Sequence, residues 1–535
     1  MGSKTMESMN SGYKVLITTA GVGQRLGFLT QFTNKALVRV GKKPALAYII
    51  ESYPEDIPMV IVTGHFGGQV KDFVKLAYPE RKNIEFVQVD KYEGEGTSLG
   101  YSMLSAKERL QCPFIFHAAD TIVLHPVPKP DKNWIGGYKG GGDTTQYASW
   151  QVIDEATLAL GEKGSLDFDY LHIGLVGIKD HEKWWANLER LYRENPDDVT
   201  LNDCRVIVEM IKEKSPFDIV NFPVWYDVGN VTSLHHARDE MPDQFHNLDK
   251  VDESIFLFDK FVIKFFANGK NVSDRVARGK LLNGLVPTIE GETENFYRYK
   301  FVPGSLYSRV ATPKDFKNFL AWAKANLWKK KRETSDAEFK SICRDFYEKK
   351  TKERVAKFME FNSISDEAYV INGEEVPSVK DMLEMIDFDH LAGAEQYQFH
   401  GDFVLDNIVK TAGGYCLMDW RQNFGGLLGA GDMYYDLAKL NHNLTVNHDV
   451  VLDNGFSVKI AGSSITCDIL RKDNLVRCQE VLRDFIEQEG LDMKKVELLT
   501  PIIWLNMSPL HHHPFNLFLY YFGKVNLWRA IQKNK

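Results

Sequence analysis

The stretch "TTAGVGQRLG", residues 18 to 27, directly follows the apolar run Val15 to Ile17. A glycine-rich turn after a buried strand commonly holds a phosphate, because glycine lets backbone amides approach the anion closely. Two familiar phosphate motifs do not match here. The dinucleotide fingerprint would need a third glycine at Leu26, and no Gly-Lys-Ser/Thr closes the loop as in a Walker sequence. The rest of the chain must therefore indicate which phosphate chemistry the loop serves.

Two cations and two carboxylates accompany the loop. Arg25 lies within it and Lys35 follows in "TNKALV". Asp120 ends the run "PFIFHAAD", and Asp227 ends "VWYD"; the ends of strands are where α/β sheets place ligands. Fixed cations beside free amides suit a triphosphate that loses pyrophosphate, a reaction that depends on positioning, charge neutralisation and Mg²⁺. We predict that Arg25 and Lys35 are catalytic and that Asp120 and Asp227 bind Mg²⁺.

From Tyr13 to about residue 239, short apolar runs alternate with amphipathic segments, which is typical of an α/β domain with a largely parallel sheet. The expected strands are "YKVLITT", "MVIVTG", "IEFVQV", "PFIFHAA", "YASWQVI", "YLHIGLVGI" and "DIVNFPVW". A polar stretch follows, then new strands, and after Thr312 a mostly helical pattern. At 535 residues the chain is too long for one core. We predict a flexible tail at 1–12, one domain at 13–245 and a second at 246–535.

A second candidate site centres on "HGDFVLDNIV" and the following "YCLMDW". Asp402 and Asn407 have the D-x4-N spacing of a kinase catalytic loop, where the acid accepts the hydroxyl proton and the amide binds metal. Asp419 stands on the next expected strand. Upstream, Lys264 lies in the middle of "FVIKFF", as the phosphate-binding lysine of a kinase small lobe does. These positions predict a catalytic Asp402, metal ligands Asn407 and Asp419, and a nucleotide contact at Lys264.

The first region resembles the sugar-1-phosphate nucleotidyltransferases, which include the NDP-sugar pyrophosphorylases and their phosphocholine cytidylyltransferase relatives. The matching segments occur in the family's order: "TTAGVGQRLGFLTQFTNKALVRVGKKP", "GEGTSLGYSM", "FIFHAAD", "GEKG", "YLHIGLVGIKD" and "WYDVGN". The resemblance implies nucleotide contacts at Gly21, Gly23, Gly96 and Thr97, and substrate contacts at Lys163 and Gly174. It also implies that an acceptor phosphate oxygen attacks the α-phosphorus, so that no protein nucleophile is needed.

Two positions depart from that family, since Asn34 and Gly164 stand where it commonly has proline. Residues 255 to 535 resemble the aminoglycoside phosphotransferase and choline kinase group, small-molecule kinases that share the protein-kinase-like fold. The sequence "MDW" stands where protein kinases have DFG, which favours a small-molecule kinase. Together the resemblances imply an α/β protein with an N-terminal Rossmann-like nucleotidyltransferase sheet domain and a C-terminal protein-kinase-like, two-lobed α+β phosphotransferase domain.

Composition limits the partners. The net charge is −8 and no long basic block is present, so we expect no nucleic-acid partner. The six cysteines form no CxxC pair, which argues against zinc and fits a reducing compartment. No apolar run is long enough for a spanning helix and no signal peptide precedes Tyr13, so we expect a soluble cytoplasmic protein without membrane contact. The sequence leaves a homo-oligomer open.

The two sites together predict a bifunctional enzyme. ATP would phosphorylate a small hydroxyl compound, with a sugar as the favoured acceptor, and an NTP such as CTP or UTP would then donate a nucleotidyl group to that phosphate. The product would be an NDP-activated precursor for capsule or surface glycan. One alternative is a choline or amino-alcohol kinase joined to a CTP:phosphoalcohol cytidylyltransferase. An alternative of another class is a nucleotidyltransferase with a non-catalytic kinase-like binding module. An aromatic cage would favour choline, and the available rings are Trp420, Tyr434, Tyr435, Trp504 and Tyr520.

Overall fold

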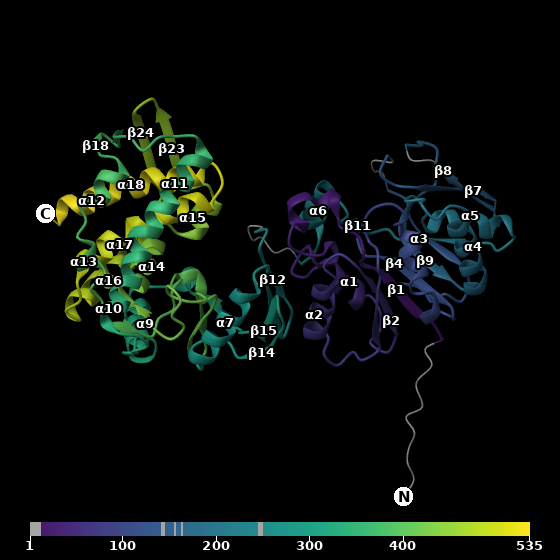
Figure 1. Ribbon diagram of the computed structural model, residues 1–535, viewed down its shortest axis with the longest axis horizontal. Helices are drawn as coiled ribbons and strands as arrows, with labels where there is room; N and C mark the ends of the chain where they lie inside the picture. The colour runs from purple at the N-terminus through teal and green to yellow at the C-terminus, as the bar shows by residue number, and fades with distance from the viewer. Residues whose placement is uncertain (1–11, 141–144, 155–156, 162–163, 244–249, 535) are drawn as a thin grey trace, which may run out of the picture. The chain divides into compact units, whose positions relative to one another are not determined.

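The computed structural model describes residues 12–140, 145–154, 157–161, 164–243 and 250–534. The described chain divides into two compact units. Unit 1 runs to Val272 and includes Gly291–Arg298, and unit 2 comprises Ser273–Glu290 and the residues from Tyr299 onward. Figure 1 labels many of the helices and strands of both units.

Unit 1 is built on a nine-stranded sheet whose main path has the order β10-β6-β9-β4-β1-β2-β3, with β7 beside β9 and β8 beside β7. The strands are β1 (Lys14–Thr18), β2 (Met59–Thr63), β3 (Ile84–Gln88), β4 (Phe114–Ala118), β6 (Trp134–Tyr138), β7 (Ser149–Asp154), β8 (Thr157–Gly161), β9 (Tyr170–Ile178) and β10 (Asp218–Asn221). Strands β3, β2, β1 and β4 are parallel, whereas β9 runs antiparallel to both β4 and β6. The α/β prediction is confirmed, and the sheet is mixed rather than largely parallel.

A short antiparallel pair, β5 (Thr121–Val123) with β11 (Trp225–Asp227), lies outside this sheet. The sequence pattern did not predict β5, β6 or β8. The helical segments of unit 1 are η1 (Gln24–Thr30), η2 (Lys35–Leu37), α1 (Ala45–Glu51), α2 (Gly67–Ala77), α3 (Leu99–Leu104), η3 (Lys107–Arg109), α4 (His181–Glu194), α5 (Asp203–Lys212) and α6 (Val231–Glu240).

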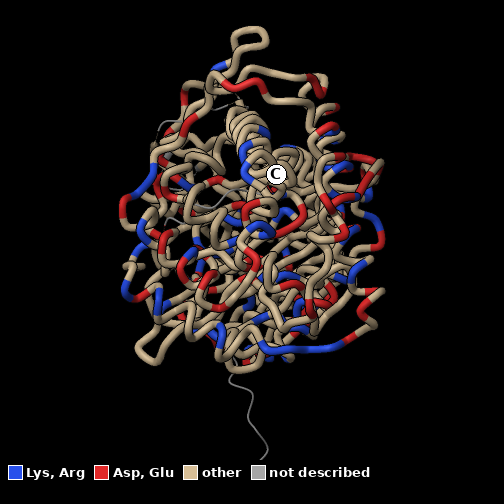
Figure 2. The backbone as a smooth tube through the Cα atoms, turned by 90° about the vertical axis from the view of Figure 1, so that its left-hand side faces the viewer, with Lys and Arg blue, Asp and Glu red and all other residues tan. Residues whose placement is uncertain are grey.

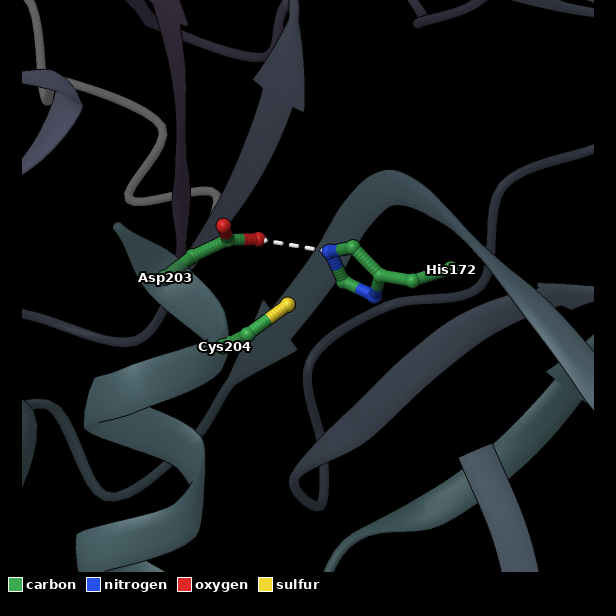
Figure 3. Close-up of side chains that lie close together, drawn as sticks. All are labelled: His172, Asp203 and Cys204. Atoms are coloured by element: carbon green, nitrogen blue, oxygen red, sulfur yellow. Dashed lines mark hydrogen bonds and ion pairs between the residues drawn. The ribbon is translucent and has the colours of Figure 1, made fainter. Parts of the chain in front are cut away.

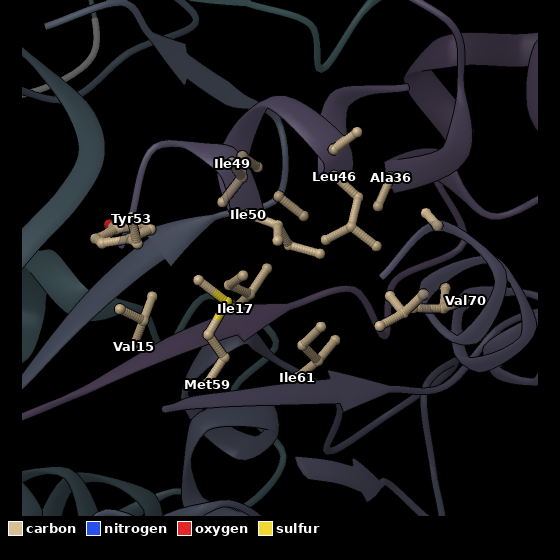
Figure 4. Close-up of a cluster of buried hydrophobic side chains, with 14 of the residues drawn as sticks. Val15, Ile17, Ala36, Leu46, Ile49, Ile50, Tyr53, Met59, Ile61 and Val70 are labelled. Carbon is tan, nitrogen blue, oxygen red and sulfur yellow. The ribbon is translucent and has the colours of Figure 1, made fainter. Parts of the chain in front are cut away.

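The middle of strand β1, Val15 to Ile17, is apolar because both faces of the sheet are covered. Val15 and Ile17 point to one core cluster and Leu16 to another, as expected for side chains that alternate along a strand. Figure 4 shows the first cluster, in which α1 lays Leu46, Ile49 and Ile50 over β1 and β2. Burial of each such side chain contributes about 1.5 to 3 kcal/mol, which fixes the strand that carries the glycine-rich loop.

The next strands form a four-stranded sheet of order β12-β13-β15-β14. The elements here are β12 (Glu253–Leu257), β13 (Phe261–Phe266), α7 (Gly269–Leu281), β14 (Ile289–Glu292) and β15 (Phe296–Lys300). Phe256, Phe265 and Phe296 belong to the same core cluster as Val15. The compact unit therefore extends past the domain boundary predicted at residue 245, because aromatic side chains after that point pack into the first core.

Unit 2 is mostly helical, as predicted for the residues after Thr312. Its helical segments are α8 (Tyr307–Val310), α9 (Pro313–Asn326), α10 (Asp336–Arg344), η4 (Asp345–Lys349), α11 (Lys350–Asn362), α12 (Val379–Glu384), α13 (Phe388–Leu391), η5 (Leu405–Asn407), α14 (Met433–Thr445), α15 (His448–Leu452), α16 (Asp473–Gln488), α17 (Met493–Met507), η6 (Ser508–Leu510) and α18 (Phe515–Lys533). Its other strands are β16 (Ser305–Leu306), β17 (Tyr369–Ile371), β18 (Glu374–Val376), β19 (Gln396–Tyr397), β20 (Ile408–Thr411), β21 (Gly414–Leu417), β22 (Gly431–Asp432), β23 (Phe456–Ala461) and β24 (Ser464–Ile469).

The small sheets of unit 2 have the orders β16-β20-β21, β18-β17-β24-β23 and β19-β22. The hairpin β20–β21 directly follows the predicted catalytic loop. Within the described residues, no helix is both long enough and apolar enough to cross a membrane. Basic and acidic segments are interspersed along the backbone (Figure 2). The two-lobed kinase-like fold stays a prediction.

Candidate active site

The glycine-rich loop leaves β1 and turns sharply at Gly23, whose φ is +71°. A Cβ at this position would lie 2.8 Å from Cβ of Lys35 and 3.0 Å from Cγ2 of Thr30. Glycine is therefore required here for both conformation and space. Gly21 differs, since a Cβ there would have no atom within 4 Å. The surroundings of Gly21 therefore give no steric reason for a glycine, and its predicted contact with nucleotide stays a prediction.

Lys35 is positioned by the residue before it. Asn34 is completely buried and donates from Nδ2 to the carbonyls of Thr19 (2.8 Å) and His65 (2.6 Å). Its Oδ1 accepts from the Ala36 amide at 2.9 Å and so caps the short helix η2, which begins at Lys35. The asparagine that departs from the family pattern therefore ties the lysine to the end of β1.

Arg25, Asp120 and Asp227 converge on one point. A Cβ added to Gly229 would lie 3.1 Å from Nη2 of Arg25, 3.1 Å from Oδ2 of Asp120 and 3.1 Å from Oδ1 of Asp227. Lys35 joins them, with Nζ 3.1 Å from Oδ2 of Asp120. The pairing of β11 with β5 explains this convergence, because it aligns Asp227 with the residue that follows Asp120. The structure thus brings together four predicted residues from distant parts of the sequence.

The two carboxylates have different electrostatic surroundings. Burial would raise the pKa of Asp120, but Lys35 and then Arg25 outweigh it and lower that pKa below its usual value. The pKa of Asp227 is raised, first by burial and then by the charge of Asp120. A divalent cation prefers hard carboxylate oxygens and would relieve repulsion between them. The donor set therefore fits the predicted Mg²⁺.

Sequence reasoning missed the residues that hold Asp227. Tyr147 donates from Oη to Oδ2 of Asp227 at 2.8 Å, the Gly229 amide donates to Oδ1 at 3.0 Å, and Asn230 donates to Oδ2 at 3.2 Å. Burial and the neighbouring carboxylate raise the pKa of Tyr147 to about 12, so this phenol remains a donor at neutral pH. The "DVGN" tetrapeptide was a signal for two of these contacts, whereas no local pattern pointed to Tyr147.

The remaining predicted contacts of unit 1 lie on other segments. Gly96 has a φ of +76°, and the following Thr97 donates from Oγ1 to the Gly94 carbonyl at 2.6 Å. Gly174 has a φ of +71° within β9, and a Cβ there would meet Cβ of Ala118 at 2.8 Å. Lys163 lies outside the described residues. The roles of these positions toward a ligand stay predictions.

A separate cluster in unit 1 joins His172, Asp203 and Cys204, whose ligand atoms lie within 4.8 Å of one another (Figure 3). His172 Nε2 is 2.8 Å from Oδ2 of Asp203, and Trp150 donates from its indole nitrogen to Nδ1 at 3.1 Å. Because an indole nitrogen only donates, Nδ1 accepts and Nε2 carries the proton that faces Asp203. The nitrogen facing the cluster is thus a donor rather than a free metal ligand, and the cluster fastens β9 to α5.

The second candidate site lies in unit 2. Asn407 donates from Nδ2 to Oδ2 of Asp402 at 3.0 Å, and Lys439 places Nζ 2.7 Å from Oδ1 of the same carboxylate. Burial would raise the pKa of Asp402, but Lys439 lowers it to about 2. Lys439 was not predicted, although it lies three positions after Asp436 on α14 and so shares a helix face with it.

Asp419 follows β21 with a φ of +52°, a left-handed conformation that is uncommon outside glycine and recurs at functional sites. Its Oδ1 accepts from Nη1 of Arg275 at 2.6 Å. Asp419 is near enough to Asp402 to raise that residue's pKa. Lys264 is buried on β13 and belongs to unit 1, so its predicted place in this site stays a prediction.

Asp436 holds the loop that carries Asp402 through hydrogen bonds to its backbone. This buried carboxylate accepts from the amides of His400 (2.8 Å) and Gly401 (2.7 Å) and from the indole of Trp328 (3.1 Å). Gly401 has a φ of +88°, so glycine suits the turn before Asp402. These contacts give Asp436 a structural role in the turn before Asp402.

No family model matches the chain. Over 107 residues, 20% of this chain, the sequence is 34% identical to the choline-phosphate cytidylyltransferase of Streptococcus pneumoniae. The N-terminal part of the chain resembles sugar-1-phosphate and choline-phosphate nucleotidyltransferases. The aligned stretch spans 44% of the pneumococcal enzyme's length.

Two nucleotidyltransferases are among the solved structures that match part of the chain. CTP:phosphocholine cytidylyltransferase from Streptococcus pneumoniae is 22% identical, with 42% of this chain and 96% of that chain covered and a TM-score of 0.34. A putative glucose-1-phosphate thymidylyltransferase from Bacillus anthracis is 17% identical, with 45% and 98% covered and a TM-score of 0.38.

Proposed function

We propose that unit 1 transfers a nucleotidyl group from an NTP to the phosphate of a small molecule and releases pyrophosphate. The observation that carries this proposal is the convergence of Arg25, Asp120 and Asp227 at Gly229, with Lys35 on Asp120. Opposite charges gathered at the end of a sheet suit a reaction whose catalysis is charge neutralisation and alignment.

Each residue has a distinct task in this proposal. Arg25 is exposed beside the loop and can contact the triphosphate, while Lys35, released from its ion pair with Asp120, can neutralise charge that develops on the leaving pyrophosphate. Asp120 and Asp227 would hold Mg²⁺, which supplies charge neutralisation and alignment of the phosphates when bound. Tyr147 and Asn230 keep the Asp227 carboxylate oriented toward Asp120.

The nature of the phosphate acceptor is the finer part of the proposal. A sugar 1-phosphate is the acceptor favoured by the sequence motifs, and the product would be an NDP-sugar for capsule or surface glycan. The relative from Streptococcus pneumoniae is named for choline phosphate, which makes CTP with phosphocholine the alternative pair. Both acceptors are phosphate monoesters, so the same chemistry applies to each.

Pyrophosphate release by the purified full-length chain tests the proposal. CTP and UTP would each be offered with glucose 1-phosphate and with phosphocholine in the presence of Mg²⁺. Asp120→Asn should reduce turnover at least about 100-fold, because it removes a charge at the metal site. Asp198→Asn provides the control, since this carboxylate lies elsewhere in unit 1, where it accepts from Thr200. Absence of pyrophosphate release with every pair would overturn the proposal.

As a second candidate function, we infer that unit 2 phosphorylates the hydroxyl of a small molecule with ATP. The supporting observation is the Asp402 carboxylate, which accepts from Asn407 and Lys439 on different oxygens, with Asp419 close by. In this reading Asp402 receives the hydroxyl proton and Asn407 with Asp419 would hold Mg²⁺. A non-catalytic binding module is the competing interpretation.

Turnover of ATP separates these two interpretations. Asp402→Asn in the full chain should abolish ATP-dependent phosphorylation of the acceptor while pyrophosphate release by unit 1 continues. ATP binding without any turnover in the unsubstituted chain would favour the binding module. Loss of both activities in the same variant would contradict the assignment of one reaction to each unit.

A further inference from the structure

Three further basic residues act electrostatically on one another and on Lys439, the lysine that contacts Asp402. Lys350 and Arg354 lie on α11, Arg421 follows the Asp419–Trp420 pair, and Lys439 lies on α14. We call these four residues the basic cluster. Lys350, Arg354 and Arg421 are partly buried, and Lys439 is 8% exposed.

Ring contacts connect Lys350 with Arg421, and Arg354 lies one helical turn after Lys350 on α11. Lys350 and Arg421 both lie over the ring of Phe346, at 3.9 and 4.9 Å from its centroid. The same ring meets Tyr435 edge-on at 5.0 Å. Tyr435 lies one helical turn before Lys439, which contacts Asp402 at 2.7 Å. Arg421 is also fixed to the catalytic loop, since its amide donates to the His400 carbonyl at 3.0 Å.

Few acidic side chains neutralise the charges of the basic cluster. Among the residues that the structure describes, Lys350, Arg354 and Arg421 form no ion pair with a carboxylate. Burial and then the charges of Arg421, Arg354 and Lys439 lower the pKa of Lys350 to about 6. Gathering like charges in a partly buried place is unfavourable unless an anion is bound there for part of the functional cycle.

The cluster also lies on a defined side of Asp402. Asn407, the proposed metal ligand, bonds Oδ2, whereas Lys439 bonds Oδ1. If the nucleotide and metal occupy the Asn407 side, the acceptor must approach from the side of Lys439 and Arg421. The positive charge is therefore placed where the acceptor has to bind.

Three of the five rings considered for a choline cage already contact other side chains. Lys495 lies over Tyr434 at 5.0 Å, Trp504 donates to His442 at 2.6 Å, and Tyr520 stacks on Phe358 at 4.5 Å. The ring of Phe346 is buried, and Lys350 and Arg421 lie over it. A quaternary ammonium would meet like charges instead of free aromatic faces.

We propose that the acceptor of unit 2 is a small alcohol that carries an anionic group, a carboxylate, sulfonate or phosphonate, which Arg354, Arg421 and Lys350 bind while its hydroxyl faces Asp402. Arginine forks match such planar or tetrahedral anions and give directional, charge-assisted bonds. In the reaction the hydroxyl oxygen bonds to the γ-phosphorus of ATP, the bond to ADP breaks, and the hydroxyl proton passes to Asp402. This inference rests on the proposed kinase function and specifies its substrate class.

A matched series of alcohols with the formula HO–CH2–CH2–X tests the proposal with the full-length chain and Mg-ATP. Isethionate, 3-hydroxypropionate and 2-hydroxyethylphosphonate are anionic, ethylene glycol is neutral and choline is cationic. We expect kcat/KM for at least one anionic member to exceed that for choline about 100-fold or more. Arg354→Gln should lower kcat/KM for the anion about 10- to 100-fold, chiefly through KM.

The control is Lys352→Gln, which removes a charge from the same helix where the lysine is exposed and pairs with Glu348 at 2.7 Å. It should leave the preference unchanged, and circular dichroism would show that both variants remain folded. Arg354→Glu should invert the order by weakening the anion and improving choline. Phosphorylation of choline or ethylene glycol as efficiently as the anions would overturn the proposed substrate class while leaving kinase activity established.

Calorimetric titration of the anionic alcohols without ATP shows which of the two proposals fails, the kinase function or the anion site. Binding that Arg354→Gln weakens, with no phosphorylation of any alcohol, would support the anion site and overturn the kinase function. No binding and no turnover of the anionic members would overturn the anion site.

Discussion

The Gly23→Ala substitution tests whether the glycine-rich loop works by placing Lys35. The residue at this position has a φ of +71°, and a Cβ would lie 2.8 Å from Cβ of Lys35. An ordinary carbon contact is about 3.5 Å, so the two groups must separate by about 0.7 Å. The left-handed backbone alone costs alanine about 1 to 2 kcal/mol.

The displacement has a predictable effect on catalysis. Asn34 holds the start of η2 through three hydrogen bonds, so Lys35 cannot move without disturbing that cap. A misplacement approaching 1 Å at a catalytic group reduces the rate about 100-fold. We therefore expect Gly23→Ala to lower kcat for pyrophosphate release by about 10- to 100-fold and to lower the melting temperature by a few degrees.

The assay is steady-state pyrophosphate release, with melting followed by circular dichroism. Gly68→Ala is the matched control, because a Cβ at this exposed helical position meets no atom within 4 Å. It should keep full activity. A double variant with Lys35→Met should lose no more activity than Lys35→Met alone, since the alanine acts through the lysine. Full activity in Gly23→Ala, or additive losses in the double variant, would refute the reasoning.

Three further predictions concern charged groups. Asp227→Asn should reduce pyrophosphate release about 100-fold or more and raise the Mg²⁺ concentration needed for half-maximal rate; an unchanged Mg²⁺ dependence would exclude Asp227 as a ligand. Lys439→Met should raise the pKa of Asp402 from about 2, because the lysine no longer opposes the effect of burial. On acidification, stability and ATP-dependent turnover should therefore begin to fall at a higher pH than in the unsubstituted chain. If both proteins lose stability and turnover at the same pH, the prediction is wrong. Burial and neighbouring cations lower the pKa of Lys350 to about 6. Affinity for an anionic alcohol should therefore fall as the pH rises above about 6, because the lysine loses its charge. An affinity that does not change with pH would show that Lys350 does not bind the anion.

The local sequence determined the elements and several site positions. The runs from "YKVLITT" to "DIVNFPVW" each contain a strand, and the central strands β1, β2 and β4 are mostly apolar because both faces of the sheet are covered there. Asp120 and Asp227 could be predicted as metal ligands because each stands at or just after the end of a strand, but the pairing of β11 with β5, which was not predicted, brings them together. The D-x4-N spacing likewise brings Asp402 and Asn407 into contact within one loop, because the intervening turn is short.

Only the tertiary structure decided what surrounds those positions. Tyr147 reaches Asp227, and Lys439 reaches Asp402, across long loops of chain whose closure no local pattern encodes. The extension of the first core past residue 245 also depends on tertiary contacts. Phe256 and Phe296 pack into the cluster that contains Val15, which is distant from them in the sequence. Hydrophobic periodicity and turn residues act over a few positions, whereas the charge that selects a substrate is the sum of side chains brought together by the fold.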